Sequence, residues 1–164
     1  MTTIAIKQAG NKIFVASDSL MTEGDRITGD SCRKVYTHKG DLLCFSGLCH
    51  KWAKFMDWAN GKVDLPDMKG ITVVRVCKDG QVLKYDSNET ESCDPYPIAI
   101  SLPYAFGSGG KYAQGAMTYD ELCSPEGAVL VASTLDIRTN DKTSSYVMVI
   151  GEGLQAEPTP SRES

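Results

Sequence analysis

The first candidate for chemistry is Thr2, the second residue of the chain. A small residue at this position allows removal of Met1, and the threonine would then become the N-terminal residue. A free N-terminal threonine carries a nucleophile and a base together, because its hydroxyl can attack a carbonyl carbon while its α-amine accepts the proton. Taken alone, Met-Thr is an ordinary chain start. The interpretation therefore depends on the residues that accompany Thr2 along the chain.

Further polar residues and glycines stand where predicted strands begin or end. In chain order they are Asp18, Lys34, Gly47, Ser108, Asp141 and Ser144. Asp18 ends one predicted strand, Lys34 opens the next hairpin and Gly47 closes that hairpin. Ser108 lies in a Gly-Ser-Gly-Gly run before a predicted helix, and an Asp-x-x-Ser pattern that begins at Asp141 precedes the last predicted strand.

Each of these residues also has a simpler interpretation. Lys34 could be a solvated lysine at a strand edge, Asp18 the start of a turn and Gly47 a glycine at the start of a helix. Ser108 could bind a phosphate at a helix N-terminus. No Gly-Lys-Ser or Gly-Lys-Thr accompanies it, which argues against a P-loop. Asp141 could be an ordinary loop aspartate.

Turn signals and apolar alternation predict three hairpins that would carry these residues. Their strands span 3–8 and 12–17, 34–37 and 42–46, and 71–77 and 81–86. The third hairpin has the strongest signal, because Asp79-Gly80 in its turn accepts a positive φ angle. Before it, apolar residues recur at helical spacing and predict one short amphipathic helix over 49–59, ended by Asn60-Gly61.

The second half of the chain changes from strands to helices. The predicted elements are a loop over 87–97, a strand over 98–106 interrupted near Pro103, helices over 112–122 and 125–135, and a strand over 146–150. Pro125 is well placed in a first helical turn. This order predicts one α+β layered domain over residues 1–151. The polar remainder, 152–164, is expected to be a flexible tail.

Length and composition restrict the class of protein. The 164 residues, with 41% hydrophobic and 23% charged side chains, fit one globular domain. The net charge of −4 and the lack of a Lys/Arg block argue against a nucleic-acid partner. No apolar run approaches the roughly 20 residues of a membrane span. The N-terminus lacks the pattern of a secretory signal, so no membrane partner and a cytoplasmic location are expected.

The cysteines and histidines indicate neither a metal site nor a disulfide framework. The six cysteines form no C-x-x-C pair and are Cys32, Cys44, Cys49, Cys77, Cys93 and Cys123. Cys44 and Cys77 stand in apolar runs and are predicted as buried thiols. Cys49 is followed by His50, but no partner stands at metal-ligand spacing. No metal and no other cofactor is therefore expected.

Together, these signatures resemble those of the proteasome β-subunits and bacterial HslV peptidases, a family of N-terminal nucleophile (Ntn) hydrolases. The resemblance runs from Thr2 to about Ile150 and rests on several short signatures in the right order. It implies a four-layer αββα sandwich with the threonine at the open end of the central sheets. The family places two helices where residues 48–70 have room for one. The resemblance therefore implies a shortened form that lacks one helix of an outer layer.

The resemblance also implies a role for each residue near Thr2, which matches the nucleophile. Lys34 matches a buried lysine whose ammonium would depress the pKa of the α-amine and polarise the hydroxyl. Asp18 matches the carboxylate that pairs with this lysine. The backbone N–H of Gly47 matches the oxyanion donor.

Supporting and substrate-binding roles follow from the same resemblance. Ser108 matches a serine that helps to orient the amine, and Asp141 with Ser144 match the family's supporting pair. The positions that line the first specificity pocket fall at Met21, Cys32, Phe45 and Cys49. These side chains are uncharged, so cleavage after apolar residues is expected. Plain core packing of Phe45 and Cys49 is the alternative.

The function implied is that of a threonine endopeptidase acting on peptides or unfolded proteins. The family forms self-compartmentalising rings of six or seven subunits, and a homo-oligomer and an AAA+ ATPase partner are implied. No propeptide is expected before Thr2, so activity would depend on removal of Met1. Two alternatives stay open. One is a catalytically silent subunit that keeps the fold for assembly, and the other is an amidohydrolase of the same fold that acts on small amides.

Overall fold

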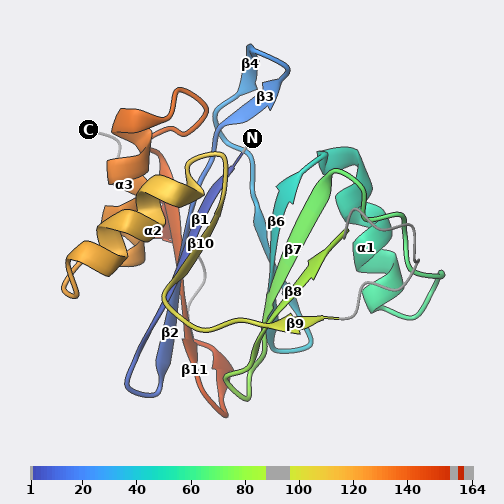
Figure 1. Cartoon of the computed structure of the whole chain (residues 1–164). Coiled ribbons are helices and arrows are strands. Elements are labelled where there is room, and N and C mark those ends of the chain that lie inside the picture. Colours follow the sequence, from blue (N-terminus) through green and yellow to red (C-terminus); the bar gives the residue numbers. More distant parts are fainter. Residues whose placement is uncertain (1, 88–96, 156–158, 161–164) are drawn as a thin grey trace.

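The computed structural model describes residues 2–87, 97–155 and 159–160, and two β-sheets that face each other form its centre (Figure 1). The first sheet contains, in spatial order, β10 (Tyr104–Gly107), β1 (Thr3–Ala9), β2 (Lys12–Asp18), β11 (Thr143–Val149) and β12 (Gly153–Leu154), and β13 (Thr159–Pro160) also pairs with β11. The second contains β5 (Val35–His38), β6 (Asp41–Gly47), β7 (Ile71–Val76), β8 (Val82–Asp86) and β9 (Ile98–Ala99). A separate hairpin of β3 (Met21–Glu23) and β4 (Arg26–Gly29) projects beyond the sheets (Figure 1).

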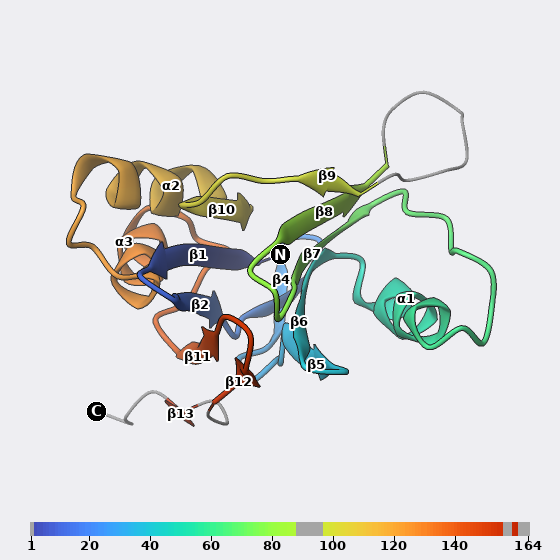
Figure 2. The ribbon, with the colours of Figure 1, turned by 90° about the horizontal axis from the view of Figure 1, so that it is seen from below.

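The helices lie on the outer faces of the two sheets. They are the 3₁₀-helix η1 (Cys49–Lys51), α1 (Trp52–Ala59), α2 (Gly110–Tyr119) and α3 (Pro125–Leu135). Helices α2 and α3 cover the first sheet, whereas α1 lies beside the second (Figure 1, Figure 2). Among the described residues, none of these helices has the length and apolar character needed to cross a bilayer.

Alternation of side chains along β1 explains the layers. Ile4 and Ile6 are fully buried in the core between the two sheets. Ala5, between them in sequence, belongs to a separate cluster with Ala113 of α2 and Ala128 of α3. Because successive side chains of a strand point to opposite faces, one strand contributes to both layers. The small alanine side chains allow the two helices to pack closely on the sheet.

The predicted hairpins and helices are present. The pairs β1–β2, β5–β6 and β7–β8 agree with the predicted strands to within one residue at each end. Gly80, in the turn between β7 and β8, has a φ angle of 94°. Helix α3 begins at Pro125, and the N–H of Gly127 donates to Ser124 Oγ (3.0 Å), which caps its first turn. The segment 60–70, all of it described, contains no helix.

The strand predicted over 98–106 is instead two short strands in different sheets. β9 pairs with β8 in the second sheet, and β10 pairs with β1 in the first. Pro103 lies between them, where the chain passes from one sheet to the other (Figure 2). Because proline cannot donate to a strand ladder, the interruption at Pro103 marks the change of sheet.

Other segments differ from the sequence-based expectations. The hairpin β3–β4 was not predicted, because its residues are largely exposed and lack apolar alternation. β11 begins at Thr143 rather than at 146. In the predicted tail, residues 153–154 and 159–160 pair with β11. Most of the predicted loop over 87–97, including Cys93, lies outside the described residues.

Candidate active site

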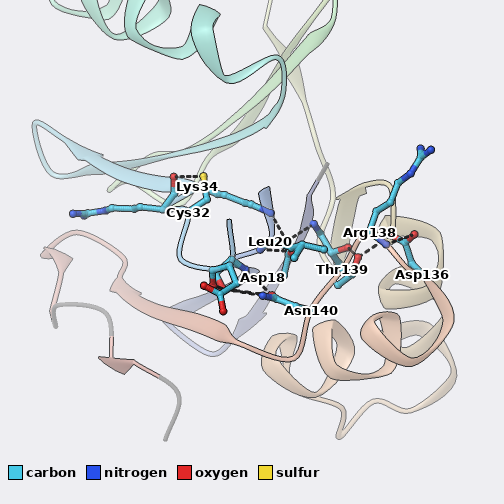
Figure 3. Close-up of polar contacts among 12 residues, drawn as sticks. Asp18, Leu20, Cys32, Lys34, Asp136, Arg138, Thr139 and Asn140 are labelled. Atoms are coloured by element: carbon cyan, nitrogen blue, oxygen red, sulfur yellow. Dashed lines mark hydrogen bonds and ion pairs between the residues drawn. The ribbon is translucent and has the colours of Figure 1, made fainter. Parts of the chain in front are cut away.

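A buried ion pair joins the two sheets at one end of the sandwich. Lys34 Nζ lies 2.7 Å from Asp18 Oδ1, and the two side chains are 1% and 0% exposed (Figure 3). Asp18 ends β2 of the first sheet. Lys34 directly precedes β5 of the second sheet, where its carbonyl accepts from Phe45 N (2.8 Å). The Asp18 carboxylate also accepts from Thr3 N (2.7 Å) and Leu20 N (3.1 Å), so both of its oxygens are bonded.

Burial and the ion pair act in opposite directions on Lys34. Removal from water disfavours the ammonium and lowers the pKa of Lys34, although the adjacent Asp18 carboxylate favours the charged form. The lysine is therefore a buried cation, held by a carboxylate, with a pKa below that of an exposed lysine.

Thr2 lies at this end of the sandwich and is 2% exposed. It lines a small pocket together with residues from β3, the segment before β5, the end of β6, η1 and α1. The lining residues are Thr2, Leu20, Met21, Thr22, Cys32, Lys34, Gly47, Cys49 and Trp52. The structure thus brings Thr2, Lys34 and Gly47 to one pocket, although they are far apart in the chain.

Two glycines allow the close packing of backbone around this pocket. Gly47 ends β6 with a φ angle of 92°, and a Cβ there would lie 2.1 Å from the carbonyl oxygen of Gly70. That same oxygen accepts from Leu48 N (3.0 Å). Gly107, opposite Thr3 in the sheet, also has a φ angle of 92°, and its Cβ would lie 1.8 Å from the Thr2 carbonyl oxygen. No other residue type fits at either position without a shift of the backbone.

A second polar group contacts the start of β1 from the segment after α3. Thr139 Oγ1 donates to Asp136 Oδ2 (2.8 Å). Because its proton is used there, the hydroxyl of Thr3 donates to Thr139 Oγ1 (2.6 Å). Burial raises the pKa of Asp136, but the Thr139 hydrogen bond opposes it and the net pKa is lowered. Figure 3 shows Asp136, Thr139 and Asp18 in one set of polar contacts.

Ser108 lies beside this second polar group. Its Oγ is buried and has no regular hydrogen bond among the described residues. It lies near enough to the Asp136 carboxylate to favour the charged form of that carboxylate, which lowers the pKa of Asp136. The following Gly109 allows close packing here, since a Cβ on it would lie 2.2 Å from Thr3 Oγ1 and 2.7 Å from Thr139 Oγ1. The Gly-Ser-Gly-Gly run thus packs against the polar group that contacts β1.

The structure does not bring Asp141 and Ser144 into this polar group. Asp141 is exposed ahead of β11, and Ser144 lies opposite Ser17 in the ladder with β2. Among the described residues, no hydrogen bond joins either side chain to Asp18 or Thr139. The neighbouring Asp-x-x-Thr pattern, from Asp136 to Thr139, is in contact instead. The sequence contains both patterns within nine positions, and the sequence analysis considered only the one at Asp141.

Three of the four predicted substrate-binding residues line the pocket, namely Met21, Cys32 and Cys49. Phe45 does not. It is fully buried and stacks on Trp52, with ring centroids 5.5 Å apart. The sequence analysis missed Leu20, Thr22 and Trp52 as lining residues. Trp52 belongs to the apolar stripe of α1, and that stripe gave no signal that one of its members also reaches the pocket.

Comparisons with known proteins support the fold. No protein-family model matches the sequence, and no curated protein sequence matches it. Among solved structures, Thiobacillus denitrificans BPH in complex with epoxomicin is similar, with a TM-score of 0.73 at 15% identity, over 92% of this chain and 100% of that chain. A second structure of this BPH has a TM-score of 0.73 at 16% identity, over 92% and 99% of the two chains.

A third similar structure is the eukaryotic HslV from Trypanosoma brucei, with a TM-score of 0.67 at 18% identity, over 90% of this chain and 99% of that chain. The chain therefore has the mixed α/β fold of the HslV- and BPH-type, proteasome-like Ntn hydrolases. At these identities the likeness concerns the fold. The chemistry has to be argued from the residues of the site.

Proposed function

We propose that this chain is a threonine endopeptidase whose nucleophile is Thr2 after removal of Met1. The observation that carries the proposal is the buried Lys34–Asp18 ion pair on the pocket that Thr2 lines. Burying a lysine costs desolvation energy even when it is paired, so such a pair is weak evidence for stability alone. A catalytically silent subunit would gain little from keeping it.

The proposed reaction is acyl transfer. The α-amine of Thr2 takes the proton of its own hydroxyl, whose oxygen attacks the carbonyl carbon of a peptide bond. The Lys34 ammonium lowers the pKa of the amine, which favours the neutral base, and Gly47 N–H donates to the oxyanion. The C–N bond breaks, and the leaving amine carries away the proton. Water then hydrolyses the ester on Thr2 and restores the hydroxyl.

Asp136, Thr139 and Ser108 take the supporting role in this proposal, in place of Asp141 and Ser144. Thr139 contacts the residue that follows the nucleophile, and its own hydroxyl is held by Asp136. In this proposal, the Ser108 hydroxyl, which has no regular hydrogen bond among the described residues, bonds the amine that appears when Met1 is removed. Together the three side chains would fix the position of the base relative to the hydroxyl.

The pocket supports a preference for apolar residues on the acyl side of the cleaved bond. Its lining residues include the apolar Leu20, Met21 and Trp52, and the one charged residue among them, Lys34, is held by Asp18. Peptides and unfolded proteins stay the proposed substrates. The proposed location is cytoplasmic.

The proposed assembly is a homo-oligomeric ring of six or seven subunits that encloses the pockets, with an AAA+ ATPase as partner. We assign the layers to an αββα sandwich that lacks one outer helix. In place of that helix, the segment before β7 is held by hydrogen bonds from Lys51. Its Nζ donates to Asp67 Oδ2 (2.9 Å) and to the carbonyl of Lys69 (2.7 Å). Sedimentation of the purified chain tests the ring, and a monomer would exclude it.

Epoxomicin, present in one BPH structure, provides the direct test of the nucleophile. The purified chain is treated with epoxomicin, and its intact mass and N-terminal peptide are measured. We expect loss of Met1 and one adduct on Thr2. Thr2→Ala should form no adduct and lose peptide turnover while keeping the fold, whereas Thr2→Ser should keep both in part. A retained Met1, or turnover by Thr2→Ala, would disprove the proposal.

A further inference from the structure

The pocket beside Thr2 contains two thiols that the proposed reaction does not use. Cys32 precedes Lys34 in the segment that enters β5, and Cys49 follows Gly47 at the start of η1. Both line the pocket together with Thr2, and both lie at the open end of the β5–β6 hairpin, Cys32 before β5 and Cys49 after β6. Two nucleophilic sulfurs thus share the space in which a substrate side chain would lie.

The thiols of the described cysteines differ in accessibility. Cys49 is exposed, Cys32 is half-buried and Cys44 is fully buried in the core between the sheets. Burial strongly raises the pKa of Cys44, which makes it unreactive. Cys77 and Cys123 are half-buried and do not line the pocket. Solvent access therefore favours reaction at Cys49.

Cys32 and Cys49 are close enough to influence each other electrostatically. Burial raises the pKa of Cys32, and a negative charge on Cys49 raises it further, although Lys34 opposes both effects. Near neutral pH, Cys32 is therefore a protonated neighbour of the more accessible thiol. Because only a thiolate attacks a disulfide, Cys32 would be slow to displace a group bound to Cys49 through sulfur.

One residue that lines the pocket, Trp52, has a hydrogen-bond donor without an acceptor in the described part of the chain. Trp52 is 8% exposed, and its Nε1 is buried without a partner among the described residues. Trp52 lines the same pocket as Cys49. A buried N–H without an acceptor costs about 1–3 kcal/mol. A ligand that carries amide or carboxylate oxygens could provide that acceptor, whereas a purely apolar one could not.

We propose that Cys49 is a modification site for low-molecular-weight disulfides with peptide-like amide and carboxylate groups, and that the adduct fills the pocket on which Thr2 lies. In the reaction, the Cys49 thiolate attacks one sulfur of the disulfide and forms a new S–S bond. The original S–S bond breaks, and the leaving thiolate takes up a proton. The disulfide is thereby consumed as the oxidant, and no other co-reactant is needed.

Glutathione disulfide is the probe for this site. The reduced, desalted full chain is incubated with it near pH 8, close to the ordinary thiol pKa of about 8.5. Intact mass counts the adducts, and peptide mapping assigns them among the six cysteines. We expect the first glutathione on Cys49, ahead of Cys32, and its loss in Cys49→Ser. The matched control Cys123→Ser should keep it. If Cys49 stays unmodified while another described cysteine reacts, the inference is wrong.

The effect on the pocket rests on the proposed function and is measured separately. Turnover of a fluorogenic peptide should fall in proportion to the glutathione on Cys49 and return after treatment with dithiothreitol. Full turnover by the modified chain would show that the adduct does not fill the pocket. That result would overturn the proposed effect on the pocket. A chain that forms the adduct but never cleaves peptides would count against the proposed peptidase and not against the thiol site.

Discussion

The carbonyl oxygen of Gly70 occupies the space in which a Cβ on Gly47 would stand, with only 2.1 Å between the two positions. The end of β6 is therefore packed directly against the residue that precedes β7. Gly47 is also the proposed oxyanion donor, so the position of its N–H depends on the Gly70 backbone. The segment that precedes β7 thus contacts a residue of the candidate site.

Gly47→Ala should reduce both stability and activity. The alanine would have to hold a φ angle of 92° and displace the Gly70 carbonyl, which we expect to cost about 1–3 kcal/mol of unfolding free energy. A shift of about 1 Å at the N–H should reduce turnover about 10²-fold. Urea unfolding and peptide turnover measure the two effects.

Gly115→Ala is the matched control for this substitution. Gly115 lies within α2, and nothing lies within 4 Å of the position that its Cβ would take. Alanine should therefore stabilise the helix by about 0.5–1 kcal/mol and leave turnover unchanged. Equal effects of the two substitutions would contradict the importance of the Gly47–Gly70 packing.

Lys34→Met should destabilise the protein, because it leaves the Asp18 carboxylate buried without its cation. Removal of one partner of a buried ion pair costs about 3–5 kcal/mol. Adding Asp18→Asn should recover part of that loss, since the amide carries no charge and still accepts from Thr3 N. Neither variant should cleave peptides. Urea unfolding of the single and double variants measures the loss of stability and its partial recovery. A double variant as active as the parent would contradict the proposed role of Lys34.

Acid should weaken the contact between the segment after α3 and the start of β1. The pKa of Asp136 is lowered in the folded chain, so its contribution to stability is present above the unfolded value of 3.8 and is lost as pH falls through the lower folded value. Thr139→Val removes the donor and should reduce this contribution. Unfolding free energies between about pH 6 and about pH 2 should therefore fall less steeply for Thr139→Val than for the parent. Identical slopes would disprove the assignment.

Salt should affect substrate binding more than stability. The hairpin β3–β4, whose Met21 and Thr22 line the pocket, is linked to the segment after α3 by the ion pairs Arg138–Asp25 (2.8 Å) and Lys142–Asp30. These groups are largely exposed, so salt screens their attraction. We expect KM to rise with ionic strength while kcat changes little.

Charge reversal tests the same link without salt. Arg138→Asp should speed hydrogen exchange of the amides in β3–β4 and raise KM, and combining it with Asp25→Arg should restore both. Reversal of Lys62, whose pair with Asp57 lies on the α1 side of the molecule, is the matched control and should change neither. Lack of rescue by the double variant would show that the Arg138–Asp25 pair does not hold the hairpin.

Local patterns in the sequence were sufficient for most elements and for part of the site. Alternation and turn residues act over a few positions, which is why the three hairpins and α3 were predicted nearly to the residue. Asp18 and Lys34 stand at strand ends, and their pairing was implied by the resemblance to the proteasome-like family. The hairpin β3–β4 was missed because exposed, polar strands carry no alternation.

The choice among similar residues depended on the tertiary structure. Thr3 and Thr139 are 136 positions apart, and only the order of strands in the first sheet and the packing of α3 bring their hydroxyls to 2.6 Å. That packing places Asp136 and Thr139, and not Asp141 and Ser144, in contact with the start of β1. It also buries Phe45 in the core and leaves Trp52 on the pocket wall. A local pattern determines the face on which a side chain lies, but which distant residues meet that face depends on long-range pairing that no short stretch of sequence encodes.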